Sequence, residues 1–510
     1  MAPTLCSRCG DAFDEGCDPR EELAQLDALL ERLTLKRYDL KRKINQFHSP
    51  ILRQLSPDVT STIFEFCLPD FTDHSLSPYI KKNLLKNHSL PLSLGAICSY
   101  WRDIAWSTPS LWSSLMFCDT NEFNSRTVTG VVQEWLVRSG RLPLSIRILS
   151  TFYNETVSAL VDIINQYSIR WSDLELDIPR RCYERFHSFQ TDIHAPILKS
   201  IRFHSTVTTT AVTRKLKFTL TCPRLERASL SYFPGKTNIQ WDNLSHLTLN
   251  SMSIIDSILI LRKTPRLVFC QILGFCSYHN VGELNTAAPV LTPLRSLHLL
   301  INNSAAEHFL NNLIAPHLEE FSLPRHYIPR IEVTTSFLRR SACSLRSLSM
   351  IFHIFPPYFE GFMNLLQSMP SLTALSISTL ERYHPPNILQ LVAKVLSSQS
   401  ASLQQGFLPN LKILEITGEL YLRPGDYDDL CPLPPAHNAV HGPFHLLKLN
   451  LCSTTRIPEK MISYISNLAE RGVEVNVSSD SEDILRSSID YYRCRKDFDW
   501  ADNFDSSLFS

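Results

Sequence analysis

The chain has 510 residues, which exceeds the length at which a single hydrophobic core usually stops growing. We therefore expect several modules or an extended repeat array. Its 50 basic and 50 acidic residues cancel, which argues against nucleic acid or an anionic membrane as the dominant partner. Glycine is scarce, with 14 residues against 31 prolines, so glycine-rich phosphate-binding loops are not expected.

The first 19 residues predict an irregular tail that contains Cys6, Cys9 and Cys17. Cys6 and Cys9 have the spacing of one half of a zinc site, but a complete site needs four ligands. Two interpretations stay open for this tail, a zinc site and a loose segment with unpaired thiols. No secretory signal is recognisable, and no segment approaches the roughly 18 apolar residues of a membrane span. With 14 cysteines and no such signal, we expect a reduced protein of the cytoplasm or nucleus.

Residues 20–48 carry apolar side chains at alternating spacings of three and four, with charged residues on the other faces. This seam consists of Leu23, Leu26, Leu30, Leu33, Leu40, Ile44 and Phe47, and Arg37 interrupts it. The pattern predicts a heptad helix that ends before Pro50. Two interpretations are open, a coiled coil that forms a homodimer through residues 23–47 and an amphipathic helix that packs back on its own chain.

Residues 49–118 predict a small α-helical domain. A short helix begins at Pro57, where proline suits the first helical turn. A polar, proline-containing stretch follows at 69–89. Apolar residues then recur at spacings of three and four between Leu94 and Ala105, which predicts one helix. A Thr-Pro pair ends that helix, and another apolar turn follows it.

The motifs of this domain resemble an F-box. The matching residues are Leu55, Pro57, Val59, Ile63 and Phe64, then Leu92, Leu94, Ile97 and Cys98, and finally Trp101, Arg102, Ile104, Ala105, Pro109, Leu111 and Trp112. The segment is most similar to the large basidiomycete fungal expansion of F-box-like proteins, which also carry a heptad helix just upstream. It departs from the family at Ser56, where proline is usual, and at Thr60, where leucine is usual. The stretch at 69–89 is also longer than the link of a minimal F-box.

An apolar pattern of the form LxxLxL recurs eleven times, often just after a proline. The copies are WSDLEL (171–176), LKSIRF (198–203), LERASL (225–230), LSHLTL (244–249), LVFCQI (267–272), LRSLHL (294–299), LEEFSL (318–323), LRSLSM (345–350), LTALSI (372–377), LKILEI (411–416) and FHLLKL (444–449). Most of their spacings fall within the range of leucine-rich repeats. The stretches between copies predict helices at 258–263, 306–314, 359–369 and 387–398.

The predicted fold class is therefore α/β, with a heptad helix and a small α-helical F-box followed by an irregular leucine-rich-repeat solenoid with a curved parallel sheet. We expect a linker helix and the solenoid over 119–477 and an acidic, serine-rich tail over 478–510. A globular domain of βα units is the alternative, because a parallel sheet also alternates short strands with helices. Polar insertions at 397–406 and 421–443 interrupt the repeats, either as a binding surface or as loops without a role.

No catalytic constellation is present in the sequence. The patterns GxSxG, HExxH, Walker A and GxGxxG do not occur. His441 and His445 are four residues apart, but the Gly-Pro pair between them prevents the helix that would align them as metal ligands. Cys98 has no nearby histidine and is expected to be a core thiol. We therefore expect no enzyme, no cofactor and no resident metal.

The resemblance implies the substrate-recognition subunit of a Skp–cullin–F-box type E3 ubiquitin ligase. In that family the F-box docks a Skp-class adaptor, and through it a cullin–RING ligase, while the repeats hold a protein substrate, here of unknown identity. The adaptor-binding residues carried over are Leu55, Pro57, Ile63, Phe64, Leu92, Leu94, Ile97 and Trp101. Their spacing does not tell which of them face the adaptor and which pack the domain. The alternative is a ligase-independent, protein-binding scaffold with a degenerate F-box.

Overall fold

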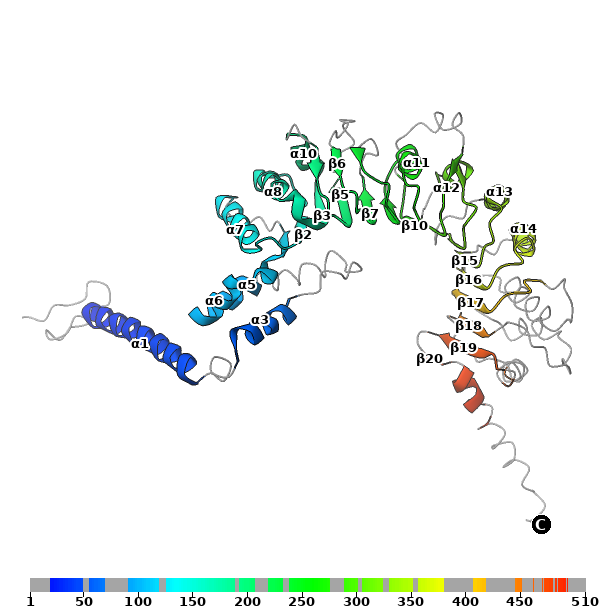
Figure 1. Cartoon of the computed structure of the whole chain (residues 1–510). Coiled ribbons are helices and arrows are strands. Elements are labelled where there is room, and N and C mark those ends of the chain that lie inside the picture. Colours follow the sequence, from blue (N-terminus) through cyan, green and yellow to red (C-terminus); the bar gives the residue numbers. More distant parts are fainter. Residues whose placement is uncertain are drawn as a thin grey trace, which may run out of the picture. The chain divides into compact units, whose positions relative to one another are not determined.

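A computed structural model represents the chain (Figure 1). It describes residues 19–48, 55–68, 90–118, 125–188, 192–206, 219–232, 238–275, 289–300, 305–323, 330–351, 356–379, 407–418, 445–451, 462, 470, 472–479, 482–483, 485–491 and 493. The chain separates into two compact units, Met1–Ser145 and Ile146–Ser510. The cysteines of the tail, the stretch at 69–89, the predicted helix at 387–398, His441 and the insertions at 397–406 and 421–443 lie outside the described residues.

Helix α1, Pro19–His48, covers the whole of the predicted heptad segment. Two acidic residues in its first turn, Glu21 and Glu22, lie at the positive end of the helix dipole. The side chains described on this helix, residues 20–44, are all exposed, including the leucines of the seam. The described residues therefore do not show the alternative in which this helix packs back on its own chain.

Helix α3, Pro57–Phe66, begins where the sequence predicts. Ser56 caps it, because the Oγ atom of Ser56 accepts the backbone N–H of Val59 at 3.3 Å. The hydroxyl of the buried Thr60 donates to the carbonyl of Ser56 at 3.0 Å. The two residues that depart from the F-box pattern thus have defined roles at the start of this helix.

The prediction of a single helix between Leu94 and Ala105 is wrong, because the structure has two helices there, α5 (Leu90–Ile97) and α6 (Ser99–Ser107). Cys98 between them is extended, and its sulfur accepts the backbone N–H of Trp101 at 3.5 Å. Cys98 therefore acts as the N-cap of α6. The apolar spacing continues through the break because both helices bury residues in the same core.

Three further elements complete the first unit. A 3₁₀ turn, η1 (Pro109–Trp112), leads into strand β1 (Ser114–Cys118), and helix α7 (Ser125–Arg138) follows. Gly140 ends α7 with a positive φ of 59°, a conformation that glycine adopts without strain.

One large sheet dominates the second unit, and its strands lie in chain order (Figure 1). They are β2 (Leu144–Leu149), β3 (Trp171–Pro179), β5 (Ser200–Thr206), β7 (Arg227–Ser231), β9 (His246–Asn250), β10 (Phe269–Ile272), β12 (Ser296–Leu299), β14 (Glu320–Ser322), β15 (Ser347–Ile351), β16 (Ala374–Thr379), β17 (Ile413–Gly418), β18 (Leu446–Leu451), β19 (Glu474–Ser479) and β20 (Glu482–Asp483). The pairings from β3 to β19 are parallel, and β19 pairs with β20 in antiparallel fashion. Each of the eleven LxxLxL copies overlaps with one of these strands, which confirms the predicted α/β class with a mostly parallel sheet.

Helices connect many of the strands and lie along one side of the sheet in Figure 1. They are α8 (Glu155–Asn165), α11 (Ile254–Arg262), α12 (Ala305–Asn311), α13 (Ile331–Ser341) and α14 (Pro356–Gln367), with the shorter η2 (Ser168–Arg170), α9 (Arg180–Tyr183) and α10 (Arg185–Ser188). Helix α13 was not predicted, because its first half is rich in β-branched residues that favour strands. The predicted helical stretch at 306–314 ends early, since α12 stops at Asn311.

Short strands at the turns form two smaller parallel sheets beside the large one. The first pairs β11 (Val290–Leu291) with β13 (Leu313–Ile314), and the second joins β4 (Ile193–His194), β6 (Thr219–Thr221) and β8 (Asn238–Ile239). These pairings give the backbone groups between the main strands and the helices hydrogen-bond partners.

The three apolar positions of the repeated pattern form the core of the second unit. In the copy at 244–249, Leu244, Leu247 and Leu249 are fully buried. Burying one such leucine side chain contributes roughly 1.5–3 kcal/mol. Because side chains alternate along a strand, the residues between these positions face the side of the sheet away from the helices. We call this side the open face.

Candidate protein-binding surfaces

Aromatic rings make up the core of the first unit. The ring centroids of Phe64 on α3 and Trp101 on α6 lie 4.9 Å apart. Trp112 is buried and lies edge-on to two further rings, with its centroid 5.3 Å from that of Trp106 and 4.9 Å from that of Trp135 on α7. Edge-to-face pairs of this kind add roughly 0.5–1.5 kcal/mol each beyond area burial. The tryptophans that are crowded in the sequence therefore form one packed cluster.

Two further contacts close this cluster. A Cβ atom added at Gly95 would lie 1.9 Å from a ring carbon of Trp106, so α5 can approach the ring only with glycine there. The guanidinium of Arg138 on α7 lies over Trp106 and Trp112, at 4.8 Å and 5.2 Å from the ring centroids. Helix α7 is consequently part of the packing of the first unit.

The eight predicted adaptor-binding residues fall into three groups in the structure. Phe64 and Leu94 are buried, Leu55 and Trp101 are half-buried, and Pro57, Ile63, Leu92 and Ile97 are exposed. Phe64 and Leu94 pack the domain, and the exposed residues are free to meet a partner. The structure thus separates the buried members of this set from the exposed ones.

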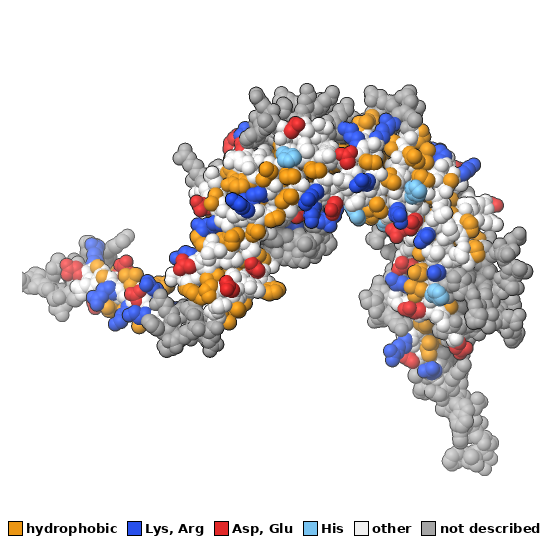
Figure 2. All heavy atoms as spheres, viewed as in Figure 1, with side chains coloured by type: hydrophobic (Ala, Val, Ile, Leu, Met, Phe, Trp, Pro, Cys, Tyr) orange, Lys and Arg blue, Asp and Glu red, His pale blue; other side chains and the backbone are white. Residues whose placement is uncertain are grey.

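The exposed side of α3 carries three apolar residues. Val59, Ile63 and Phe66 follow one another at spacings of four and three, so they share one face of the helix, which we call the α3 stripe. Their exposed fractions are 47%, 43% and 86%. Figure 2 shows hydrophobic side chains on the surface of this unit. Sequence reasoning missed Val59 and Phe66 as site residues, although their helical spacing to Ile63 was a usable signal.

A second candidate surface is the open face of the large sheet. Its middle row consists of residues that the strand register sets side by side, Glu175, Arg202, Ser229, Thr248, Gln271, His298, Ser322, Ser349, Ser376, Glu415 and Lys448. Most of these side chains are half-buried and polar. A row of such groups offers hydrogen-bonding and charged contacts to a polar partner.

Charged groups gather at the β2–β5 end of the open face. The Nε atom of Arg147 lies 3.2 Å from a carboxylate oxygen of Glu175, and both side chains are largely buried. Burial lowers the pKa of Arg202, and the Glu175 carboxylate opposes that shift. The charges that act on Arg202 also include Arg227 and Asp173. Three arginines against two carboxylates give this end of the row a positive excess, which favours an acidic partner.

Three rings lie next to one another in the middle of the open face. Phe269 lies between His246 and His298, with ring centroids 5.7 Å and 5.2 Å away. The hydroxyl of Ser296 lies 2.9 Å from Nε2 of His298 and donates to Glu320 at 3.0 Å. Burial lowers the pKa of His298, while Glu320 opposes that shift. We call His246, Phe269 and His298 the ring ladder.

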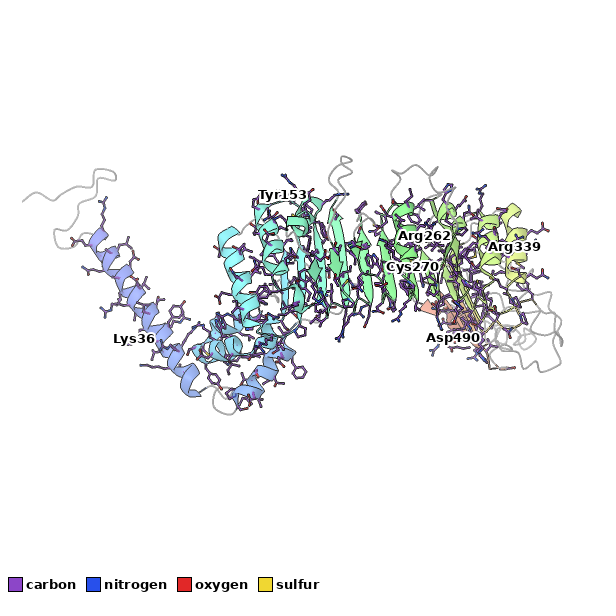
Figure 3. The ribbon with its side chains drawn as sticks, turned by 45° about the horizontal axis from the view of Figure 1, so that its top comes forward. Lys36, Tyr153, Arg262, Cys270, Arg339 and Asp490 are labelled. Atoms are coloured by element: carbon purple, nitrogen blue, oxygen red, sulfur yellow. The ribbon has the colours of Figure 1, made fainter. Side chains whose placement is uncertain are left out.

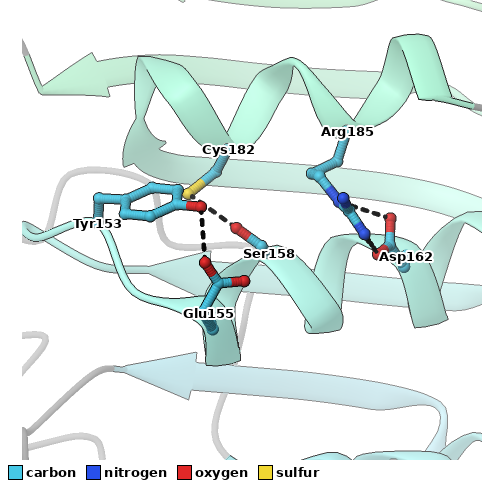
Figure 4. Close-up of polar contacts among 6 residues, drawn as sticks. All are labelled: Tyr153, Glu155, Ser158, Asp162, Cys182 and Arg185. Atoms are coloured by element: carbon cyan, nitrogen blue, oxygen red, sulfur yellow. Dashed lines mark hydrogen bonds and ion pairs between the residues drawn. The ribbon is translucent and has the colours of Figure 1, made fainter.

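The polar groups of the opposite, helical side stabilise the fold instead. Figure 4 shows Arg185 paired with Asp162 of α8, and the hydroxyl of Ser158 directed at the sulfur of Cys182. Burial raises the pKa of Cys182 to about 11, so its thiol stays protonated and is a poor nucleophile. Burial likewise raises the pKa of Cys270, labelled in Figure 3, to about 12.

Two observations bear on other classes of site. Among the described residues, no three histidine, cysteine or acidic side chains group closely enough to hold a metal ion. No helix in the described part of the chain is long and apolar enough to cross a membrane.

Comparison with known proteins gives no relative: no protein-family model matches the chain, and no curated protein matches it either.

Proposed function

We propose that the chain is the substrate-recognition subunit of a Skp–cullin–F-box type E3 ubiquitin ligase and performs no chemistry itself. In this proposal the first unit is an F-box-like domain that docks a Skp-class adaptor. The second unit is an irregular leucine-rich-repeat solenoid that holds a protein substrate. The F-box motifs of the sequence motivate the proposal.

The α3 stripe is the observation that carries the proposal. Helix α3 already buries one apolar side, where Phe64 packs against Trp101. Phe66 on the same helix is nevertheless 86% exposed. Exposed apolar residues gathered on one helix face mark a contact surface for another protein. The exposed Leu92 and Ile97 on α5, which the F-box resemblance also assigns to the adaptor, add to this surface.

The departures from the F-box pattern are compatible with adaptor binding. Ser56 caps α3 in place of the usual proline, and Thr60 is buried with its hydroxyl bonded to the Ser56 carbonyl. Both residues preserve the helix that presents the α3 stripe. Neither of them reduces the apolar character of the exposed side.

The open face of the sheet is the proposed substrate surface. Its strands lie in chain order and pair in parallel, with the apolar repeat positions buried beneath the helices. This arrangement supports the solenoid interpretation over a globular domain of βα units, since solenoid repeats contact mainly their neighbours. The buried arginines near Glu175 and the ring ladder supply charge and aromatic contacts on one surface.

A ligase-independent scaffold is the second candidate. In a scaffold the open face would also be the binding surface, but the α3 stripe would have no partner. Binding of a Skp-class adaptor separates the two functions.

The test is co-expression of the full chain with a Skp-class adaptor, followed by purification and a measured dissociation constant. We expect a 1:1 complex. Ile63→Asp and Phe66→Asp should each weaken it at least thirtyfold, because each places a charge in a desolvated apolar contact. Val137→Asp is the matched control, since Val137 is a 60% exposed residue of α7 outside the stripe.

The outcomes are distinct. No complex with the wild-type chain would favour the scaffold. A complex that tolerates both stripe substitutions would place the adaptor elsewhere. Thermal melts of the variants verify folding, which these exposed positions should leave intact.

A further inference from the structure

Helix α1 presents a leucine seam that the described chain leaves exposed. The exposed fractions on the seam are 60% for Leu23, 51% for Leu26, 61% for Leu30, 54% for Leu33, 51% for Leu40 and 56% for Ile44. A helix of 30 residues with this seam has the length and pattern of a short coiled-coil strand. We propose that its partner is the α1 helix of a second copy of the chain, and that the two helices run antiparallel.

The charges of α1 are divided along its length. The half up to Leu33 holds the acidic residues Glu21, Glu22, Asp27 and Glu31, together with Arg20 and Arg32. The half beyond Leu33 holds Lys36, Arg37, Lys41, Arg42 and Lys43, together with Asp39. An antiparallel pair sets the acidic half of each helix against the basic half of the other. A parallel pair sets like halves together, which is repulsive.

The antiparallel pairing also sets apolar residues of the seam against apolar residues of the second copy. With the two-fold axis at residue 35, Leu26 meets Ile44 of the second copy, and Leu30 meets Leu40. The seam residues are thus complementary to themselves when one helix is reversed. This self-complementarity is what an isologous two-fold interface requires.

Arg37, the only break in the seam, discriminates between the two directions. In a parallel dimer Arg37 would face Arg37 of the second copy and bring two buried cations together. In the antiparallel dimer it faces Leu33 instead. The aliphatic part of the arginine can cover that leucine while its guanidinium reaches solvent.

The residues that flank the seam give the same answer. In a parallel dimer Glu22 would lie beside Asp27, and Lys36 beside Lys41, so both flanking pairs would be repulsive. In the antiparallel dimer Asp27 lies beside Lys41 of the second copy, and the two-fold axis creates this attractive pair twice. Lys36 then lies beside Lys36 of the second copy, so one like-charge pair remains, against four in the parallel dimer.

The proposal does not rest on the proposed function. Antiparallel pairing places the C-terminal ends of the two α1 helices at opposite ends of a rod about 45 Å long, from 30 residues at 1.5 Å each. Each copy of the domain that begins after α1 would then be tethered at its own end of the rod. Adaptor binding and dimerisation can therefore succeed or fail separately.

The first part of the test is the mass of the purified full chain by sedimentation equilibrium at micromolar concentration. We expect a dimer. Leu30→Asp should make it a monomer, whereas Leu35→Asp should leave it dimeric, because Leu35 is equally exposed at 61% but lies away from the seam. A wild-type monomer, or a dimer that tolerates Leu30→Asp, would overturn the proposal.

Charge reversal tests the direction. Asp27→Lys and Lys41→Asp should each raise the dimer dissociation constant about tenfold, because each turns two attractive pairs into repulsive ones. The double variant should return it to the wild-type value. A parallel dimer predicts the opposite, since each single reversal would then place an unlike charge beside Glu22 or Lys36. Tighter dimers from the single variants would therefore refute the antiparallel arrangement.

Discussion

Trp135 on α7 lies edge-on against Trp112, with ring centroids 4.9 Å apart and ring planes at 74°. Residues 23 positions apart are thereby joined in one core, although the motifs that resemble an F-box end at Trp112. The folded unit thus continues to α7, beyond the motifs. A fragment that ends at Trp112 would lack one wall of this core.

The first prediction concerns that wall. Trp135→Ala should destabilise the first unit by about 3–5 kcal/mol, because it removes a buried ring from a packed cluster. Trp135→Phe should cost far less, since the indole N–H of Trp135 has no hydrogen-bond partner in the structure. Denaturant unfolding of the two variants measures the difference. Equal losses would show that ring packing is not the cause.

The second prediction compares two glycines. Gly95→Ala should destabilise the chain by about 1–3 kcal/mol, because its methyl group would overlap the Trp106 ring. Gly130→Ala should stabilise it by about 0.5–1 kcal/mol, because Gly130 is within α7 and no atom lies within 4 Å of the new Cβ. Thermal unfolding of the two variants should shift in opposite directions. A shift in the same direction would contradict the close approach of α5 to Trp106.

The third prediction is a pH dependence in the ring ladder. Burial lowers the pKa of His298 in the folded state, so the folded protein holds fewer protons here than the unfolded chain does. The contribution of this group to the free energy of unfolding is therefore complete above the ordinary histidine pKa of about 6.5 and falls as the pH drops through that value. His298→Asn should weaken this loss between about pH 7 and pH 5 relative to wild type. Denaturation midpoints across that range, compared at each pH, give the result, and parallel pH profiles would exclude a role for His298.

The fourth prediction separates the cysteines by reactivity. Burial raises the pKa of Cys222 and of Cys270 to about 12, and that of Cys182 to about 11, so little thiolate forms at pH 8. Cys67 is exposed at the end of α3. Iodoacetamide under native conditions should label Cys67 within minutes and leave the other three unlabelled until denaturant is added. Mass spectrometry of digested samples reads this out, and early labelling of Cys270 would contradict the packed sheet.

The elements that local periodicity specifies were predictable from the sequence. The heptad spacing of α1 and the alternation of the LxxLxL strands each reflect one apolar face, so the pattern and the structure coincide. Cys98 shows the limit of this reasoning. A single extended residue between two helices leaves the apolar spacing intact. The break is evident from the extended backbone of Cys98 and from the hydrogen bond that the N–H of Trp101 donates to the Cys98 sulfur.

The candidate site was predictable in position but not in orientation. The motifs indicated Ile63 and Phe64 together, and they are adjacent in the chain, yet one is exposed and the other packs on Trp101. Which side of α3 becomes the core depends on contacts with α6, which are distant in sequence. The same reason hid Phe66, whose exposure is evident only once the core is known.

The strands of the large sheet succeed one another in space as they do in the chain, and this order has a mechanical consequence. Each inner strand is held by the strand before it and the strand after it, and none of the described strands returns to pair with an earlier one. A force applied to the C-terminal end would meet these strands one at a time. Under force, the second unit should therefore unfold strand by strand from one edge, with many small steps of extension instead of a single rupture.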